Sequence, residues 1–413
     1  MTARTFAVCL IALSAWGLTA CGTDSETETS RTLKIYVSAP MTGGRGGQDT
    51  ARAVEIAVEN AGGRIDSAKI EVVALNDAAP SGAFSPKLVR RNANLAANDD
   101  AAIAYIGEFD SGGTEISMPI LNQAGILHVS PSSTAVKLTE PSPDEGERLR
   151  PTGVTTFGRV VPNDTVQAGA LEQFMVQESV KKVYVVDDGG TYGTGLRKLF
   201  SRAAAVNGLK VIDGPRVTPR TSFGTLAERI SRLDPNALLF AGSDLDLAYD
   251  MFDSLHRVNS HIKLFGGDGL ALSGFLRALG DIELDTYVTA PQLPAGNYAK
   301  SGEEYLDTFE ERFGREAEPM SVFGYEAGAV VIDSIRRGVR GDIAADPISY
   351  LRSGSRVAFF DTTERASPLG SYSIDSDGDT TLTFYGAYRV EGGRLVLGRT
   401  IDVPTSILQE LEE

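Results

Sequence analysis

The chain has very little cysteine: only Cys9 and Cys21 occur in 413 residues. Both lie near the N-terminus, so the rest of the chain has no cysteine that could form a disulfide or bind a metal ion. We therefore expect a body that is held together by its hydrophobic core alone.

Histidine is also scarce, and the patterns that mark catalytic centres are missing. The three histidines are His128, His256 and His261, and they form no H-E-x-x-H zinc motif. No G-x-S-x-G motif occurs, and residues 179–182 match S-x-x-K without the companion motifs of that enzyme class. We expect a protein that is not an enzyme and that uses no cofactor.

The chain has fewer positive than negative residues: 39 Lys and Arg against 55 Asp and Glu, which gives a formal charge of −16 at pH 7. Such a field repels a phosphate backbone, so we exclude nucleic acid as a partner. The hydrophobic content of 42% is ordinary for a globular protein, and the length allows two domains.

Two local patterns imitate ligand motifs without completing them. Residues 43–47 (GGRGG) lie where a dinucleotide fingerprint would start, but Asp49 replaces the third glycine and would repel a pyrophosphate. Residues 375–379 begin like a calcium loop, but Gly378 comes before the position where that loop has its glycine, and no glutamate completes the set. We expect no nucleotide site and a solvated turn at 375–379.

Long apolar runs are absent except at the N-terminus. Residues 6–18 form an apolar run that is too short to span a bilayer, and the sequence LTAC follows at 18–21. This ending resembles the lipobox of bacterial lipoproteins, in which the signal peptide (1–20) is removed and the cysteine is acylated. The alternative is an ordinary secretory signal. We expect Cys21 to carry a lipid and the polar segment 21–32 to be a flexible tether.

From Leu33 onward, short apolar strands alternate with amphipathic helices. Continuously apolar strands that are separated by helices are typical of parallel sheets with both faces covered. The sequence therefore predicts an α/β fold with two doubly wound units. The predicted strands are 33–38, 69–75, 102–106 and 126–129 in the first unit, and 182–186, 237–240 and 262–265 in the second.

Further elements predict that the chain returns between the units. Asp164 and Gln167 have the spacing of a helix capping box, and 140–153 reads as an exposed loop. Helices are expected after Tyr287, and an antiparallel hairpin at 382–397. We expect lobe I to comprise 33–155 and 289–385, and lobe II to comprise 156–288 and 386–413.

Polar residues gather where two neighbouring strands of the first unit end. Ser111 follows one strand and opens a helix, and Ser132 and Thr134 follow the next. Ligands bind at this edge of open α/β sheets, and free N–H groups at a helix start favour an anion. Each hydroxyl alone is equally well explained as a helix cap. Together they predict one shared anion site.

The order of several motifs resembles the type 1 periplasmic binding proteins, specifically the leucine/isoleucine/valine-binding branch. The resemblance covers essentially the whole chain after the tether. The resembling stretches are 40–43, 59–63, 105–107, 129–134, 159–164, 183–186, 192–193, 264–269 and 378–379.

This resemblance implies two doubly wound parallel-sheet lobes that are joined by three crossovers and close over an amino acid or similar solute. Ser111, Ser132 and Thr134 match the positions that hold the ligand carboxylate, with Ser132 acting through its backbone. Asp268 matches the residue that binds the ligand ammonium, and Tyr192 matches an aromatic residue that lines the cleft. An ordinary Gly-Asp-Gly turn at Asp268 and simple packing of Tyr192 are the alternatives.

The chain also departs from the family pattern. The disulfide of the first lobe is absent, since Ala79 and Asp110 stand near its positions. If Arg45, Asp110 and Asp244 face the cleft beside Asp268, a polar or charged solute suits the pocket better than leucine.

These features predict a monomeric substrate-binding lipoprotein that sits in the periplasm or on the cell surface. The lipid would attach it to a membrane beside its partner, the permease of an ABC transporter. A ligand-sensing lobe for a membrane signalling partner is the alternative function, and an enzyme on this fold is a third.

Overall fold

The computed structural model describes residues 31–341 and 343–412, so Cys21 and the predicted signal peptide lie outside the described residues. β1 (Thr32–Ala39) is the first strand of the folded body. Arg31 donates hydrogen bonds to the backbone carbonyls of Ile343 and Asp346, at 3.1 and 2.5 Å. Residues 31 and 32 of the predicted tether are thus part of this body.

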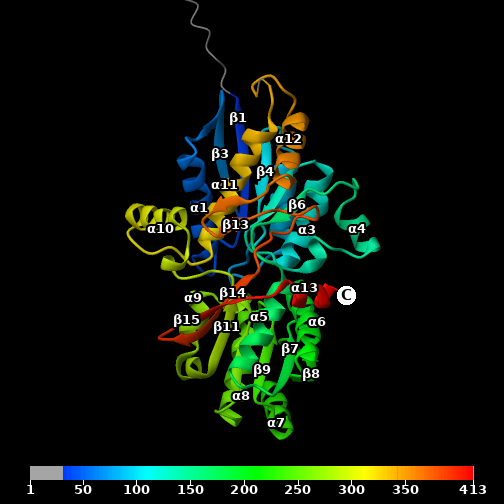
Figure 1. Ribbon diagram of the computed structural model, residues 1–413, viewed down its shortest axis with the longest axis vertical. Helices are drawn as coiled ribbons and strands as arrows, with labels where there is room; N and C mark the ends of the chain where they lie inside the picture. The colour runs from blue at the N-terminus through cyan, green and yellow to red at the C-terminus, as the bar shows by residue number, and fades with distance from the viewer. Residues whose placement is uncertain (1–30, 342, 413) are drawn as a thin grey trace, which may run out of the picture.

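Two α/β lobes lie one above the other along the long axis of the molecule (Figure 1). The upper one is lobe I, and most of it comes from the first part of the chain. Its elements are β1, α1 (Gly46–Asn60), β2 (Arg64–Ile65), β3 (Ala68–Asn76), α2 (Pro86–Ala97), β4 (Ala102–Ile106), α3 (Ser111–Gln123), β5 (Leu127–Ser130), η1 (Val136–Leu138), α4 (Pro143–Leu149) and β6 (Phe157–Arg159).

The lower lobe, lobe II, follows directly in the chain. Its elements are α5 (Asp164–Gln177), β7 (Lys182–Asp187), α6 (Thr191–Val206), β8 (Lys210–Arg216), α7 (Phe223–Leu233), β9 (Ala237–Ala241), α8 (Leu245–Val258), β10 (Lys263–Gly266), η2 (Asp268–Leu270), α9 (Ser273–Ala278), η3 (Gly280–Asp285) and β11 (Thr286–Ala290).

After β11 the chain returns to lobe I and then comes back to lobe II, as the colours of Figure 1 make visible. The elements in lobe I are η4 (Ala295–Asn297), α10 (Lys300–Phe313), α11 (Ser321–Gly338), α12 (Ile348–Phe360), β12 (Arg365–Ser367) and β13 (Gly370–Tyr372). The last elements, in lobe II, are β14 (Phe384–Glu391), β15 (Arg394–Asp402) and α13 (Thr405–Glu412).

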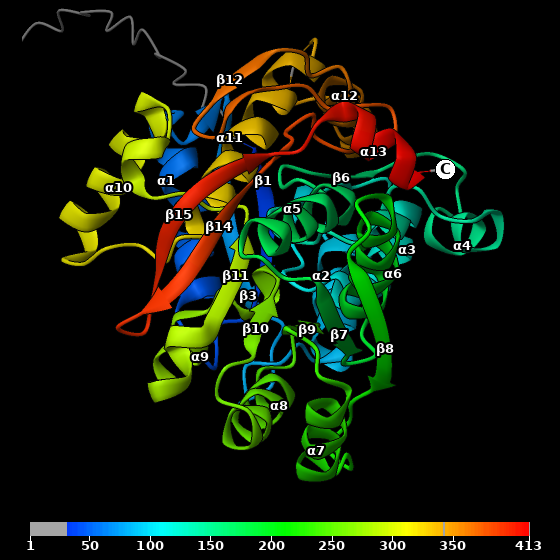
Figure 2. The same cartoon turned by 60° about the horizontal axis from the view of Figure 1, so that its bottom comes forward.

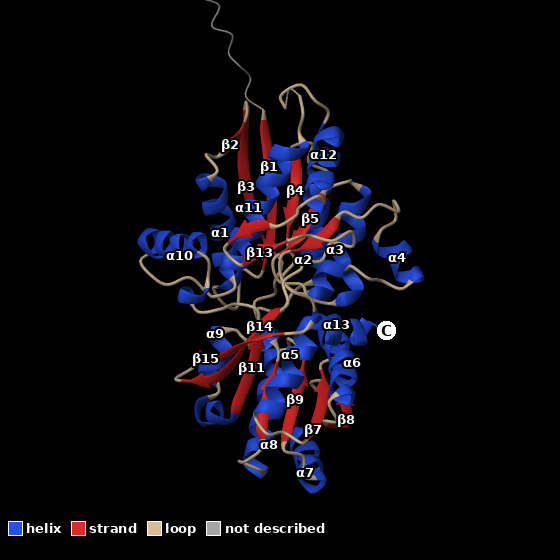
Figure 3. Cartoon of the chain, viewed as in Figure 1, coloured by secondary structure: helices blue, strands red, loops and turns tan. Residues whose placement is uncertain are grey.

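Each lobe has a central sheet whose two faces are covered by helices (Figure 3). The sheet of lobe I has the order β2-β3-β1-β4-β5-β6, and that of lobe II has the order β15-β14-β11-β10-β9-β7-β8. Successive side chains of a strand point to opposite faces, so in β1 Ile35 packs against α1 and α11 while Tyr36 packs against α2 and α3. The predicted α/β fold with two doubly wound lobes is confirmed.

The two sheets are mostly parallel, with antiparallel strands at their edges. β1 pairs in parallel with β3 and β4, while β2 is antiparallel. In lobe II the hairpin of β14 and β15 adds to the parallel strands through β11. All seven predicted strands are present within one residue of their expected bounds, and the predicted hairpin is present too.

Two local expectations were wrong. The loop at 140–153 contains α4, whose first turn is closed by a capping box of Ser142 and Glu145. The cap of α5 is Asn163, whose Oδ1 accepts a hydrogen bond from the N–H of Thr165 at 3.0 Å. Asp164, expected to be the cap, is the first helical residue and is buried.

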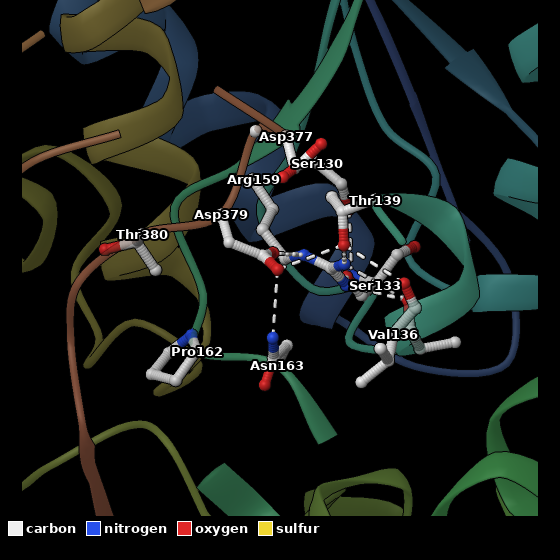
Figure 4. Close-up of polar contacts among 12 residues, drawn as sticks. Ser130, Ser133, Val136, Thr139, Arg159, Pro162, Asn163, Asp377, Asp379 and Thr380 are labelled. Carbon is white, nitrogen blue, oxygen red and sulfur yellow. Dashed lines mark hydrogen bonds and ion pairs between the residues drawn. The ribbon is translucent and has the colours of Figure 1, made fainter. Parts of the chain in front are cut away.

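The turn at 375–379 is only in part the solvated turn that we expected. Asp375 Oδ1 accepts hydrogen bonds from three successive backbone N–H groups, which is a local turn. Asp379, however, is only 6% exposed and forms an ion pair with the fully buried Arg159, at 2.5 Å (Figure 4). Thr139 and Asn163 also donate to this carboxylate, at 3.0 and 2.9 Å.

This ion pair lies where the chain passes between the lobes. The chain crosses at 160–163, at 291–294 and at 380–383, so Arg159 precedes the first crossing and Asp379 precedes the third. Tyr385 at the start of β14 donates to the carbonyl of Pro162 at 3.1 Å. The first and third crossovers are thus held side by side.

Replacing Asp379 with Asn should lower the free energy of unfolding by about 3–5 kcal/mol, because it leaves the buried guanidinium of Arg159 without its countercharge. Urea denaturation of the purified protein measures this change. Glu304→Gln is the matched control, since Glu304 pairs with Lys300 on an exposed helix face, and it should change the value by less than about 0.5 kcal/mol. Equal effects of both substitutions would contradict this role of Asp379.

Candidate functional site

The first part of the candidate site lies where β4 ends and α3 begins. Ser111 is the first residue of α3 and is buried. Asp110 caps the helix, because its Oδ1 accepts a hydrogen bond from the N–H of Gly112 at 2.7 Å. The first turn of a helix has N–H groups without helical partners and carries a partial positive charge, so this position favours an anion.

The loop after β5 lies against the start of α3. Ser111 Oγ accepts a hydrogen bond from the N–H of Ala135 at 3.2 Å. Ser130 and Ser133 both donate to the backbone carbonyl of Glu108, at 2.8 and 3.0 Å, and this ties the loop to the end of β4. The structure therefore brings the two polar segments that follow β4 and β5 into direct contact.

Arg159 fixes the direction of the peptide groups in this loop (Figure 4). Its guanidinium donates to the backbone carbonyls of Ser133 and Ala135, at 2.7 and 3.1 Å. The carbonyl between them, that of Thr134, accepts a hydrogen bond from the N–H of Asp164 at 2.9 Å. Within the described residues the N–H of Thr134 has no acceptor, so it is available to a ligand.

Ser132 is placed differently from Thr134. Thr134 is buried, whereas Ser132 is half-buried. The backbone N–H of Ser132, which the resemblance assigned to the ligand, contacts the hydroxyl of Ser130 at 3.2 Å. A ligand carboxylate would therefore share or replace that contact, and the role of Ser132 stays a prediction.

The second part of the site belongs to lobe II and is centred on Asp268, the first residue of η2. Asp268 Oδ1 lies 2.7 Å from the hydroxyl of Tyr192 and accepts a hydrogen bond from Gln167 Nε2 at 2.8 Å. Burial raises the pKa of Asp268, and the donors on Tyr192 and Gln167 oppose the rise. Backbone N–H groups of Asp268 and Gly269 also interact with this carboxylate, but among the described residues no side chain donates to Oδ2, so this oxygen can still contact a cation.

Asp164 is a second buried carboxyl group close to Asp268. It is fully buried, and within the described part of the chain neither of its oxygens accepts a well-aligned hydrogen bond. Burial raises the pKa of Asp164 to about 8, against the effect of the neighbouring Thr134 hydroxyl, and the charge of Asp268 adds to the rise. This group is therefore mostly protonated at neutral pH.

The lobes are closed on each other in this structure, since side chains of one lobe bond directly to the other. Ser243, after β9, donates to Asp110 Oδ2 at 3.0 Å, and Thr191 at the start of α6 donates to Glu115 Oε2 at 2.8 Å. Figure 2 shows α3 and α6 side by side at this boundary. A cavity of about 450 Å³ opens beside the Glu115 contact.

Of the three charged residues whose direction the sequence left open, only Asp110 reaches across the cleft. Arg45 is half exposed and lies 3.3 Å from Glu318, which also accepts a hydrogen bond from Ser273 of the other lobe at 3.0 Å. Asp244 is exposed and caps α8 through the N–H of Leu247, at 3.1 Å. Arg45 and Asp244 thus have structural contacts of their own.

Sequence reasoning did not assign three residues to the site: Asp164, Gln167 and Ser243. Gln167 lies one helical turn after Asp164, and we interpreted that spacing as a cap when it in fact places both side chains on one face of α5. Ser243 lies directly after the apolar strand β9, at the edge of the sheet where ligands bind. That position was a usable signal for Ser243.

The contact between Ser243 and Asp110 predicts how easily the lobes separate. Ser243→Ala removes a hydrogen bond to a buried carboxyl group, worth about 1–3 kcal/mol to the closed form, so the ligand-free protein should become more open. Small-angle X-ray scattering should give it a larger radius of gyration than the unsubstituted protein has. Ser260→Ala, at an exposed position of lobe II, is the control; identical scattering from both variants would contradict the prediction.

Comparisons with known proteins agree with this geometry. A Leu/Ile/Val-binding protein of Rhizobium johnstonii is 24% identical over 88% of this chain and 93% of its own length. The crystal structure of a leucine-binding protein from Thermotoga maritima superposes with a TM-score of 0.76 at 21% identity, covering 91% of this chain and 99% of that one.

A solute-binding protein of Rhodopseudomonas palustris in complex with benzoate gives a TM-score of 0.70 at 19% identity, over 89% of this chain and 96% of that one. At these identities the two structures establish the likeness of fold. The family model of the periplasmic binding proteins matches residues 32–387, nearly the whole described chain. The chain therefore belongs to the periplasmic binding protein family of solute-binding proteins.

Proposed function

We propose that this protein is an extracytoplasmic solute-binding lipoprotein of an ABC importer. It closes its two lobes over an amino acid or a similar small polar solute, and it releases that solute unchanged to a permease in the membrane. A lipid on Cys21 keeps it at the membrane surface beside that permease.

One observation carries the proposal: the polar groups that lobe I presents to the cleft suit an anion, and those that lobe II presents suit a cation. Lobe I presents the free N–H of Thr134 beside Ser111 at the start of α3, which suits a carboxylate. Lobe II presents Oδ2 of Asp268, to which no described side chain donates, and this suits an ammonium group. An amino acid carries both charges close together, so only the closed form satisfies both of its ends.

Tyr192 and Ser132, the other residues predicted from the sequence, lie beside the two proposed charge-binding positions. Tyr192 orients Asp268 through its hydroxyl and packs at the lobe boundary, and Ser132 borders the carboxylate position. The lobes would rotate about the three crossovers. We place the first crossing at 160–163, a few residues after the sequence-based boundary of 155, because β6 pairs with β5 in the sheet of lobe I.

The chemistry of the cleft favours a polar side chain on the solute. Related proteins are named for binding leucine, isoleucine and valine, or hold benzoate. In this chain Asp110 bonds across the cleft to Ser243, and burial raises the pKa of Asp110. An apolar side chain that displaced Ser243 there would leave Oδ2 of Asp110 without its donor, which costs about 1–3 kcal/mol.

Isothermal titration calorimetry with the twenty amino acids and with benzoate tests the proposal. We expect a polar or charged amino acid to bind more tightly than leucine. Asp268→Asn should weaken the binding of that amino acid by about tenfold or more, since a hydrogen-bonded charge pair contributes roughly 1.5–3 kcal/mol.

Asp244→Asn is the matched control, because Asn is an equally good helix cap and Asp244 lies outside the site. It should leave the affinity unchanged. Equal affinity of the protein and its Asp268→Asn variant for the amino acid would remove Asp268 from the ammonium position. Binding of benzoate in preference to every amino acid would contradict the proposed class of solute.

The membrane attachment is tested separately in cells. Cys21→Ser should move the protein from the membrane fraction to the soluble extracytoplasmic fraction, because a thioether-linked lipid needs the cysteine sulfur. Fractionation and labelling with a radioactive fatty acid measure this change. Cys9→Ser, inside the predicted signal peptide, is the control and should leave both label and location unchanged. A Cys21→Ser protein that still incorporates the fatty acid would contradict the assignment.

A further inference from the structure

Asp164 is near enough to Asp268 for the two charges to interact, and Gln167, one helical turn after Asp164 in α5, contacts Asp268. Asp164 is fully buried and has no well-aligned hydrogen bond from a described residue, and the donors to Asp268 are all neutral: Tyr192, Gln167 and backbone N–H groups. Two ionised carboxylates in such a place would repel each other in a medium of low dielectric constant. One of them must therefore be neutral while the cleft is empty.

The nearby guanidinium does not change this conclusion. The charge of Arg159 lowers the pKa of Asp164 and so opposes the effect of burial. Arg159, however, forms its ion pair with Asp379 at 2.5 Å, and its other N–H groups donate to backbone carbonyls of the loop after β5. The other ionisable groups near the pair are Asp379 itself and the hydroxyls of Tyr192 and Tyr385. None of these supplies a positive charge.

We propose that Asp164 holds a proton in the ligand-free closed protein, and that the ammonium group of a ligand bound at Asp268 displaces this proton into water. The inference rests on the proposed function, since it requires an ammonium group at Asp268. It adds that solute capture is linked to pH. When the ammonium contacts Asp268 Oδ2, its charge stabilises both carboxylates, and the proton leaves to solvent.

The direction of the pH dependence follows from this exchange. Burial raises the pKa of Asp164 to about 8, so Asp164 is mostly protonated at pH 7. A nearby positive charge lowers the pKa of such a carboxyl group by about 1–3 units. Release of one proton on binding makes the affinity rise with pH, by up to about tenfold per pH unit between pH 6 and 8. The solute is then held more weakly in an acidic compartment.

Calorimetry in two buffers with different ionisation enthalpies measures the protons released on binding. With L-serine, L-arginine and L-leucine as probes, we expect about one proton per bound amino acid at pH 7. Asp164→Asn, which has nearly the same shape as the protonated side chain, should abolish most of that release. Its affinity should match the unsubstituted protein near pH 6 and be weaker by up to about tenfold for each pH unit above that, as far as pH 8.

Asp244→Asn is again the matched control and should release the same proton as the unsubstituted protein. Binding heats that are independent of the buffer, or a release that Asp164→Asn leaves unchanged, would overturn the inference while leaving the proposed function intact. Absence of binding by all amino acids would instead overturn the proposed function, and the inference with it.

Thermal denaturation without any ligand provides a second, independent test. A carboxyl group whose pKa is raised by folding gives a stability that is fully present below its unfolded pKa of about 4 and is lost as the pH rises to about 8. The unsubstituted protein should therefore lose thermal stability relative to Asp164→Asn between about pH 5 and 8, and the difference should be constant above pH 8. A difference in melting temperature that does not change between about pH 5 and 8 would overturn the protonation of Asp164.

Discussion

The buried ion pair between Arg159 and Asp379 is the interaction on which the rest of the structure depends. It joins the end of β6 to the segment before β14, so it holds two of the three crossovers together between the lobes. The same guanidinium holds the carbonyls of Ser133 and Ala135. The position of the crossovers and the direction of the peptide groups in the ligand loop are therefore set by one side chain.

This arrangement supports the proposed anion position in lobe I. The carbonyls of Ser133 and Ala135 are held by Arg159, whereas the N–H of Thr134 between them has no acceptor among the described residues. Lobe II has the complementary character, because it places the carboxyl groups of the buried Asp164 and the half-buried Asp268 near the boundary. A ligand with separated charges therefore gains contacts from lobe closure that neither lobe offers by itself.

The fold could be predicted from the sequence because its strands are short, apolar and separated by amphipathic helices. The edge strand β8 was missed, since its residues are mostly exposed and follow no apolar pattern. α4 was missed because its seven residues are too few to establish a helical period. Both failures concern elements whose conformation depends on the surface or on a local cap.

The site could be predicted only in part. Ser111, Thr134 and Asp268 follow strands and could be placed at the edge of a sheet from the sequence. The contacts that orient them could not be placed, since Arg159 and Asp379 are 220 positions apart and Gln167 reaches Asp268 across 101 positions. From the sequence, Asp110 and Asp244 were equally plausible as residues that face the cleft. Only the packing of the lobes shows that Asp110 contacts Ser243 across the cleft, whereas Asp244 caps α8.

A crystal structure of the protein with the amino acid that it binds most tightly tests the account most directly. We predict that the ligand carboxylate lies within hydrogen-bonding distance of Ser111 and the N–H of Thr134, while the ammonium group contacts Asp268. A ligand bound in the reverse orientation, or held by one lobe without the other, would contradict the account.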